Sequence, residues 1–323
     1  MAISSLKTGA MKRSLLVGNS AYQPLGSRAV FAGGGVGISV NVIDYVDIAT
    51  IGNATDFGDL NVNSETNAGA SSSTRGLSAG GETAGANSRA PRIDYFTIAT
   101  TGNAINFGDM VAGSYWPAGA SNETRALIGG GTESSGTTSA RMTYVTIATT
   151  GNATNFGDLI TSQSRTRGMG SAASSTRALF AGGCGAGATY QADIEYYTID
   201  TTGTSTTFGD LTVLRGFIAG GASSGTRTLF AGGEISNGVN TNTIDYVTIA
   251  STGNATDFGD LNYSGNATTT STYTRAVHAR TSGNNNTIDY TTIATTGNAS
   301  DFGDLTVARS NSMAAVSNGH GGL

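Results

Sequence analysis

The sequence has little charge and almost no cysteine, and each shortage limits what the protein can be. Charged residues make up 12% of the 323 residues, and the net charge is −5 with the basic residues scattered singly. Such a chain lacks the basic patch that binds phosphate backbones, so we expect no nucleic-acid partner. Cys184 is the only cysteine, so no intrachain disulfide can form.

Long apolar runs are also missing. No run approaches the roughly 20 residues that cross a bilayer. The N-terminal patch Leu15-Leu16-Val17 is too short for the apolar core of a secretory signal. We therefore expect neither membrane insertion nor export by the general secretory route.

Histidine is scarce, which bears on metal and cofactor chemistry. His278 and His320 are the only two histidines, and Cys184 lies far from both along the chain. No metal-ligand spacing can be assembled from them. The glycine-rich stretch 33–37 is not followed by the Lys-Ser or Lys-Thr pair of a phosphate loop. We expect no metal and no cofactor.

Glycine, with 48 residues, is abundant, and much of it belongs to an internal repeat. The block Phe-Gly-Asp, followed by Leu or Met, has its Phe at positions 57, 107, 156, 208, 258 and 302. A second block, Arg followed by a small and an apolar residue, begins at positions 28, 75, 125, 177, 227 and 275. A fixed period of this length determines the architecture before any local structure is assigned.

Each copy has the pattern of several short strands, and the fifth copy shows it best. Thr228–Ala231 is an apolar stretch that ends at a Gly-Gly pair, where the chain can bend. Residues 243–249 alternate between two apolar faces and predict a buried central strand. A Thr-Gly-Asn turn then leads into a third strand over 256–261. A fourth strand precedes the next Arg and is the most variable part, although residues 312–316 are plainly strand-like.

Four short strands per copy predict an all-β fold, a six-bladed β-propeller. An apolar stretch that ends in Gly-Gly, then a Tyr, then an aromatic residue, resembles the kelch repeat. The sequence departs from that family in having Phe where Trp is usual, and His278-Ala279-Arg280 where the last Gly-Gly pair is expected. We expect this Phe to fill the space between blades, and both the Phe and the Tyr to be largely buried in all six copies. We predict repeats at 28–74, 75–124, 125–176, 177–226, 227–274 and 275–323.

The two ends of the chain predict how the propeller closes. The first repeat begins at its Arg28 strand and lacks the strand that precedes Arg in the other copies. Residues 312–318 supply that strand, so we expect them to pair beside Arg28–Gly33. Residues 1–27 stand outside the repeats and predict an attachment arm that docks through Leu15, Leu16 and Val17.

The near-identity of the copies also resembles repeat proteins of marine bacteriophages, and Met1–Pro24 is similar to the start of virion proteins from cyanophage-like viruses. This resemblance implies a structural protein of the virion, either a tail-associated fibre or adhesin or a head decoration. Its partners would be other virion proteins, a glycan or protein on the host surface, and further copies of itself. The alternative is a secreted or cellular propeller that binds carbohydrate or acts as a scaffold.

The regular spacing of the carboxylates along the chain argues against an enzyme. The Asp of each Phe-Gly-Asp block occupies one repeat position, whereas an active site breaks repeat symmetry. We expect each of these Asp residues to cap a turn or pair with an Arg of the neighbouring blade, and we predict no catalytic residue. Tyr115 and Trp116, the only Trp, are candidates for glycan stacking, against the alternative that Trp116 fills a blade.

Overall fold

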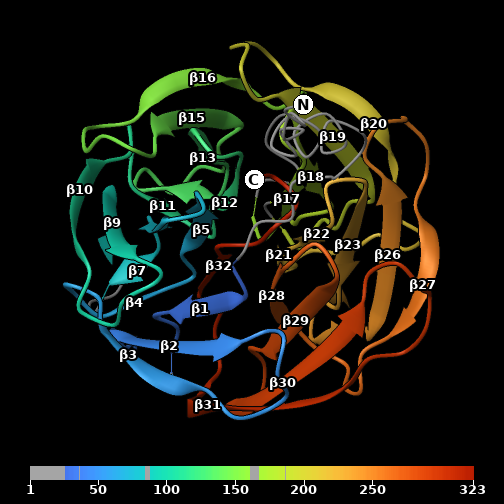
Figure 1. The fold of residues 1–323 in the computed structure, drawn as a ribbon. Helices are drawn as coiled ribbons and strands as arrows, with labels where there is room; N and C mark the ends of the chain where they lie inside the picture. Colours follow the sequence, from blue (N-terminus) through green and yellow to red (C-terminus); the bar gives the residue numbers. More distant parts are fainter. Residues whose placement is uncertain (1–25, 36, 84–87, 161–166, 186) are drawn as a thin grey trace, which may run out of the picture.

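The computed structural model describes residues 26–35, 37–83, 88–160, 167–185 and 187–323. Every regular element in these residues is a β-strand, and the strands form many small antiparallel sheets. Figure 1 shows these sheets set around a common centre, with strands such as β5, β12 and β28 nearest to it. The all-β prediction is therefore confirmed.

Six sheets of four or five strands carry the repeats, and we number them by the chain order of the strand that begins with the recurring Arg. Sheet one contains β3 (Thr55–Asp59), β2 (Val42–Asp47), β1 (Arg28–Ala32) and β32 (Ala314–Ser317). Sheet two contains β10 (Ile105–Asp109), β9 (Arg92–Thr97), β6 (Arg75–Ala79) and β5 (Ala68–Ser71). Sheet three contains β12 (Ala118–Ser121), β13 (Arg125–Gly129), β15 (Arg141–Thr146) and β16 (Thr154–Asp158).

The second half of the chain repeats this arrangement. Sheet four contains β17 (Gly170–Ala173), β18 (Arg177–Ala181), β19 (Asp193–Thr198) and β20 (Thr206–Asp210). Sheet five contains β22 (Ala222–Ser223), β23 (Arg227–Ala231), β26 (Thr243–Thr248) and β27 (Thr256–Asp260). Sheet six contains β21 (Ala219–Gly220), β28 (Ala267–Ser271), β29 (Arg275–Arg280), β30 (Asn285–Thr292) and β31 (Ser300–Arg309).

The strands of the fifth repeat lie where the sequence predicted them. The apolar stretch that ends at Gly-Gly is β23, the alternating stretch is β26, and the stretch after the Thr-Gly-Asn turn is β27. The side chains of β26 are buried on both faces over most of its length. This burial explains why the pattern is apolar on both sides.

The last strand of the chain pairs with the first, as the two chain ends predicted. β32 runs antiparallel to β1, with Ala29 opposite Ser317 and Ala32 opposite Ala314. Beyond the strand, Asn318 Oδ1 accepts a hydrogen bond from the backbone N–H of Arg28 at 2.9 Å. Residues from both ends of the chain thus complete sheet one.

One backbone contact joins each sheet to the next. In the turn that joins the central strand of a sheet to its Phe-Gly-Asp strand, a glycine N–H donates to the carbonyl of the recurring Phe of the preceding sheet, as from Gly203 to Phe156 at 2.9 Å. The series returns from sheet six to sheet one, where Gly52 donates to Phe302 at 3.0 Å. The other four pairs are Gly102 with Phe57, Gly151 with Phe107, Gly253 with Phe208, and Gly297 with Phe258.

The glycine of Phe-Gly-Asp makes this close approach possible. A Cβ added at Gly157 would overlap the carbonyl oxygen of Gly203 in the next sheet, and the same overlap with the neighbouring turn recurs in all six copies. Any side chain here would therefore separate two sheets.

The recurring Phe side chains are buried in all six copies, at most 3% exposed, as predicted. The paired Tyr was expected to be largely buried as well, and each Tyr is partly buried. Its ring lies edge to face with the Phe of the same sheet, at 5.8–6.1 Å between centroids. The recurring Arg covers the outer side of the Tyr ring, at 4.3–4.6 Å from its centroid.

The recurring Asp was expected either to cap a turn or to pair with an Arg of the neighbouring blade, and the described residues show no ion pair between the recurring Arg and Asp. The Arg side chain donates to a backbone carbonyl of the next sheet, as from Arg177 Nη1 to Ile249 O at 2.9 Å. The Asp contributes its backbone, since the N–H of Asp210 donates to Asn254 Oδ1 of the next turn at 3.1 Å. Backbone groups suit this role because they keep their positions in every copy.

We predict that replacing Gly157 by Ala destabilises the protein by about 1–3 kcal/mol, the usual cost of overpacking. Gly151 is the matched control, because its φ of +159° is close to the +158° of Gly157 but nothing lies within 4 Å of an added Cβ. Denaturant unfolding of both variants separates backbone strain from the overlap with Gly203. Equal losses for the two variants would contradict the role given to this contact.

We further predict that Phe156→Ala costs about 3–5 kcal/mol, because it removes a buried ring and leaves a cavity. Ile160→Ala is the control, since Ile160 is 51% exposed and should change stability by less than about 0.5 kcal/mol. Equilibrium unfolding measures both variants. A loss below about 1 kcal/mol at Phe156 would refute the packing role.

Candidate functional site

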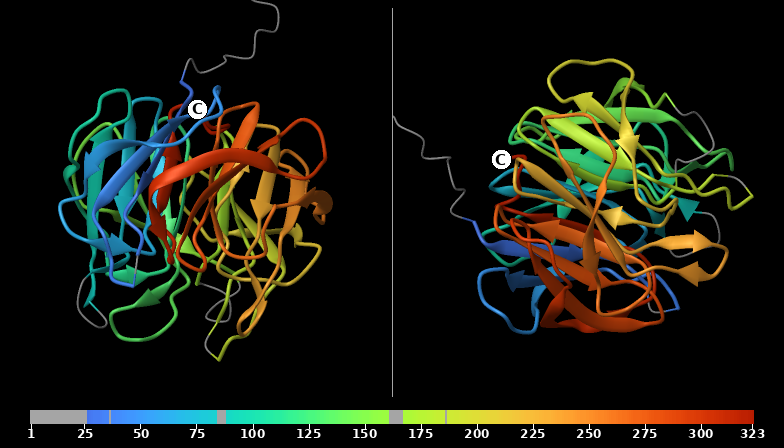
Figure 2. Two further views of the ribbon diagram at one scale, coloured as in Figure 1. Left: turned by 90° about the horizontal axis from the view of Figure 1, so that it is seen from below. Right: turned by 90° about the vertical axis from the view of Figure 1, so that its right-hand side faces the viewer.

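The sheets have two unlike ends, which Figure 2 shows as opposite edges of the molecule. At one end lie the start of β1 and the C-terminal residues, and we call it the terminal face. At the other end, which we call the loop face, the chain passes from β1 to β2 and from β3 to β5, and likewise in the other sheets. The contacts between sheets are alike in all six repeats, and the repeats differ mainly at the loop face.

Small extra sheets occur on the loop face of some repeats. They join β4 (Ser64–Glu65), β7 (Glu82–Thr83) and β8 (Ser88–Arg89) in one place, β11 (Ser114–Tyr115) and β14 (Thr132–Glu133) in a second, and β24 (Glu234–Ser236) and β25 (Val239–Asn240) in a third. The loop face is therefore irregular where the body of the molecule is regular.

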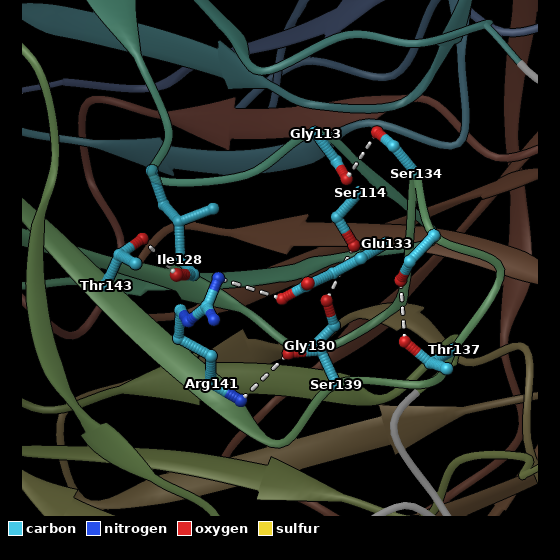
Figure 3. A network of polar contacts seen from close by, with 11 residues as sticks. Gly113, Ser114, Ile128, Gly130, Glu133, Ser134, Thr137, Ser139, Arg141 and Thr143 are labelled. Atoms are coloured by element: carbon cyan, nitrogen blue, oxygen red, sulfur yellow. Dashed lines mark hydrogen bonds and ion pairs between the residues drawn. The ribbon is translucent and has the colours of Figure 1, made fainter.

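Figure 3 shows the polar contacts that hold the loops of sheets two and three together. Glu133 Oε1 lies 3.0 Å from Arg141 Nη1. Ser114 Oγ donates to the carbonyl of Gly130 at 2.6 Å, and the N–H of Ser134 donates to Gly113 O at 3.2 Å. These loops are fixed by their own hydrogen bonds and present a defined surface.

A narrow cavity of about 60 Å³ lies at the centre, among the inner strands of the sheets. Its lining consists mainly of Gly, Ala, Ser and Thr of β5, β12, β17, β28 and β32. Small residues let the inner strands approach closely around the centre. The resulting space has room for only a few water molecules.

A strained turn surrounds the loop-face end of this cavity. A residue with a positive φ stands two positions before each of β5, β12, β17 and β21. These residues are Thr66 (60°), Trp116 (58°), Gly168 (63°) and Phe217 (55°). Side chains other than Gly or Asn rarely adopt this conformation, and such strain is a marker of functional positions. The same turn thus places Trp116 and Phe217 on either side of Gly168.

The two aromatic side chains meet over Gly168. Their ring centroids are 5.0 Å apart, edge to face, and Tyr115 and Tyr190 extend the group on either side at 6.0 and 6.4 Å. Tyr190 donates a short hydrogen bond to Glu234.

The structure does not leave Trp116 open for stacking on a sugar. Its side chain is buried, at 6% exposure, and it packs against Phe217 of another repeat. Tyr115 is partly buried, and burial raises the pKa of its hydroxyl. Of the two candidate glycan contacts, only Tyr115 retains exposed surface.

Sequence reasoning missed a series of buried polar residues on the central strands. The residue before the recurring Tyr is buried in all six sheets, and in five of them it is an acid that accepts hydrogen bonds from the preceding sheet. These residues are Asp44, Asp94, Thr143, Glu195, Asp245 and Asp289. The Asp of the Ile-Asp-Tyr pattern was the available signal.

Two of these acids form fully buried ion pairs. Arg309 Nη2 lies 3.1 Å from Asp44 Oδ2, and Arg215 Nη1 lies 2.9 Å from Asp245 Oδ2. Burial lowers the pKa of both arginines and raises the pKa of Asp44. Both arginines end a Leu-Thr-Val-x-Arg sequence, at 211–215 and 305–309, that occurs only where the pair forms.

Cys184 is a buried free thiol. Burial raises its pKa, with Arg167 Nη2 at 3.9 Å from Sγ. A neutral thiol is a poor nucleophile. Among the described residues, no group of three or more His, Cys, Asp or Glu side chains is placed to hold a metal ion.

The predicted arm residues Leu15, Leu16 and Val17 lie outside the described residues. The described part of the chain has no helix with the length and apolarity to cross a membrane. No family model matches the sequence, and no curated protein matches it either.

His278 is a buried polar residue whose protonation can be tested by changing the pH. It replaces the Phe found at this strand position in sheets one, four and five, and its ring nitrogens lie 3.1 Å from Thr269 Oγ1 and Thr291 Oγ1. Complete burial lowers its pKa from 6.5 to about 3. Between these values the unfolded chain binds the extra proton, so stability falls as the pH drops from 6.5 towards 3.

We predict that His278→Phe flattens this pH dependence by up to about 1.4 kcal/mol per pH unit. His320, whose pKa burial lowers to about 4, is unchanged in the variant and contributes equally to both curves. Unfolding free energies from pH 7 to pH 4 provide the comparison. Parallel curves for the two proteins would show that His278 takes up its proton at the same pH in the folded and unfolded states.

Proposed function

We propose that the chain is a six-bladed β-propeller with an N-terminal attachment arm, and that it works as a non-enzymatic structural protein of a virion. In this proposal sheets one to six are the blades, and β32 closes the ring. The arm docks on other virion proteins, and the loop face contacts a glycan or protein on the host surface or another part of the particle.

The circular series of contacts between sheets supports the propeller. Six equivalent bonds from a turn glycine to a Phe carbonyl lead from each sheet to the next and back to the first. The recurring Arg follows the same order and ends with Arg275 Nη1 on Ile48 O, at 2.9 Å, across the chain ends. A series that returns to its start is what a ring of blades requires.

The functional proposal rests on the opposite placement of two features, the first described residue and the irregular loops. Gly26, the first described residue, lies against Asn318 and Gly319 on the terminal face. The extra sheets and the aromatic group lie on the loop face. Attachment through the arm therefore leaves the irregular face directed outward.

Chemistry at the loop face supports binding more than catalysis. Two strained aromatic residues and a narrow cavity lie at its centre, and in the described residues the one thiol is buried. The similarity of the repeats and of Met1–Pro24 to virion proteins gives the setting. The alternative, a carbohydrate-binding or scaffold propeller, uses the same loop face without an attachment arm.

We predict that deletion of residues 1–24 leaves thermal unfolding unchanged and prevents incorporation into particles. A full-length variant with Leu15→Ser, Leu16→Ser and Val17→Ser tests whether the apolar patch does the docking, and Leu214→Ser, which changes an exposed apolar residue (48% exposed), is its control. Electron microscopy and protein composition of purified particles measure incorporation. Normal incorporation of the deletion variant would eliminate the arm and favour the scaffold alternative.

A further inference from the structure

The loop between β29 and β30 differs from its five equivalents at one dipeptide. Sheets one to five have a Gly-Gly pair here, and each of those glycines has a positive φ. Sheet six has Arg280 and Thr281 instead, and it turns later, at Gly283 (φ 72°) and Asn284 (φ 55°). The substitution adds two polar side chains where the other sheets have none.

These side chains face the loop that leads from β27 to β28. The Arg280 guanidinium lies over the ring of Tyr263, 4.8 Å from its centroid. The N–H of Thr281 donates to the carbonyl of Asn266 at 3.0 Å. Ser282 Oγ occupies the place that a Cβ at Gly265 would take. Two loops from neighbouring sheets thus bring five polar side chains together.

Five buried polar atoms of this group have no hydrogen-bond partner among the described residues. They are Arg280 Nε, Tyr263 Oη, Thr281 Oγ1, Ser282 Oγ and Asn266 Oδ1. Thr281 is fully buried, which means that bulk water does not solvate its hydroxyl.

The charge of the group is positive. Arg280 forms no ion pair with another described residue. Asp289 is the acid whose charge acts on both Arg280 and Tyr263. Its two oxygens already accept hydrogen bonds from the N–H and the side-chain amide of Asn262, both at 3.0 Å.

We propose that this group is a binding site for a small oxyanion, such as a sulfate, phosphate or carboxylate group. The Nε–H of Arg280 and the hydroxyls of Tyr263, Thr281 and Ser282 donate to its oxygens, an arrangement that suits charge-assisted hydrogen bonds. Asn266 Oδ1 is an acceptor and does not contact the anion directly in this proposal. The exposed residues Gly283 and Asn284 border the site and give the anion access.

This site is independent of the proposed role in a virion, since it follows from local geometry alone. The test is titration of the full-length, isotope-labelled protein with sodium sulfate, followed by NMR of the backbone amides of Thr281, Ser282 and Gly283. Sodium chloride at equal ionic strength is the control for screening. Phosphate and acetate, titrated separately, distinguish a tetrahedral anion from a carboxylate.

Saturable shifts with sulfate, phosphate or acetate, absent with chloride, are the expected result. Arg280→Gln should weaken the binding about 10- to 100-fold, the factor for one charged hydrogen bond. Tyr263→Phe keeps the ring packing and should weaken it less. Arg141→Gln removes a positive charge elsewhere on the loop face and should leave it unchanged.

Two results would overturn the proposal. One is the absence of saturable shifts with any of the three oxyanions, which would leave water as the only partner of these atoms. The other is equal weakening by Arg280→Gln and Arg141→Gln, which would show attraction by net charge and no built site. The shifts of the Tyr263→Phe variant decide the matter if Arg280→Gln fails to fold.

Discussion

The structure depends on one contact, the approach of a turn in one sheet to the Phe-Gly-Asp segment of the sheet before it. The turn glycine donates to the Phe carbonyl, and the next residue but one donates to the Asp carbonyl, as Ala104 does to Asp59 at 2.8 Å. Both bonds join backbone to backbone, so the distance between sheets is set by main-chain geometry. Glycine is required in the segment because a Cβ would occupy the space of the neighbouring turn. The repeat is thus preserved by a steric limit as much as by its apolar core.

This constraint explains where the chain is uniform and where it varies. Residues that set the spacing of the sheets, including the Arg, Tyr and Phe that stack in each one, make the same contacts six times. The loops of the loop face differ from sheet to sheet, and they carry extra strands, an aromatic group and buried ion pairs while the sheets stay alike. Trp116 and Phe217, which have a strained positive φ, lie where an irregular loop leads into a regular inner strand. The polar group around Arg280 lies where β29 of sheet six leads into its loop.

Polar residues were the least reliable part of the sequence analysis. The Asp of Phe-Gly-Asp was expected to use its carboxylate, yet its backbone makes the recurring contact. The carboxylates that are buried belong to the Ile-Asp-Tyr pattern, whose alternation suggested only a strand. A polar residue next to a strongly apolar strand pattern is readily taken for a solvent-facing one. Its burial depends on a hydrogen-bond donor from another sheet, about 30 residues away for Asp245 and Thr212 and at the far end of the chain for Asp44 and Thr306.

The sequence by itself determined the elements that repeat: the six copies, the strands of each copy, the buried Phe and the pairing of β32 with β1. Repetition makes these features readable, because a local pattern that recurs six times is defined by short-range geometry, such as the turn at Thr-Gly-Asn and the bend at Gly-Gly. Tertiary structure alone decided the features that occur once or twice. The burial of Trp116, the ion pairs of Arg215 and Arg309, and the group around Arg280 all join residues of different repeats. Such contacts leave no periodic trace in the sequence, since each depends on the distance between two loops that only the packed sheets bring together.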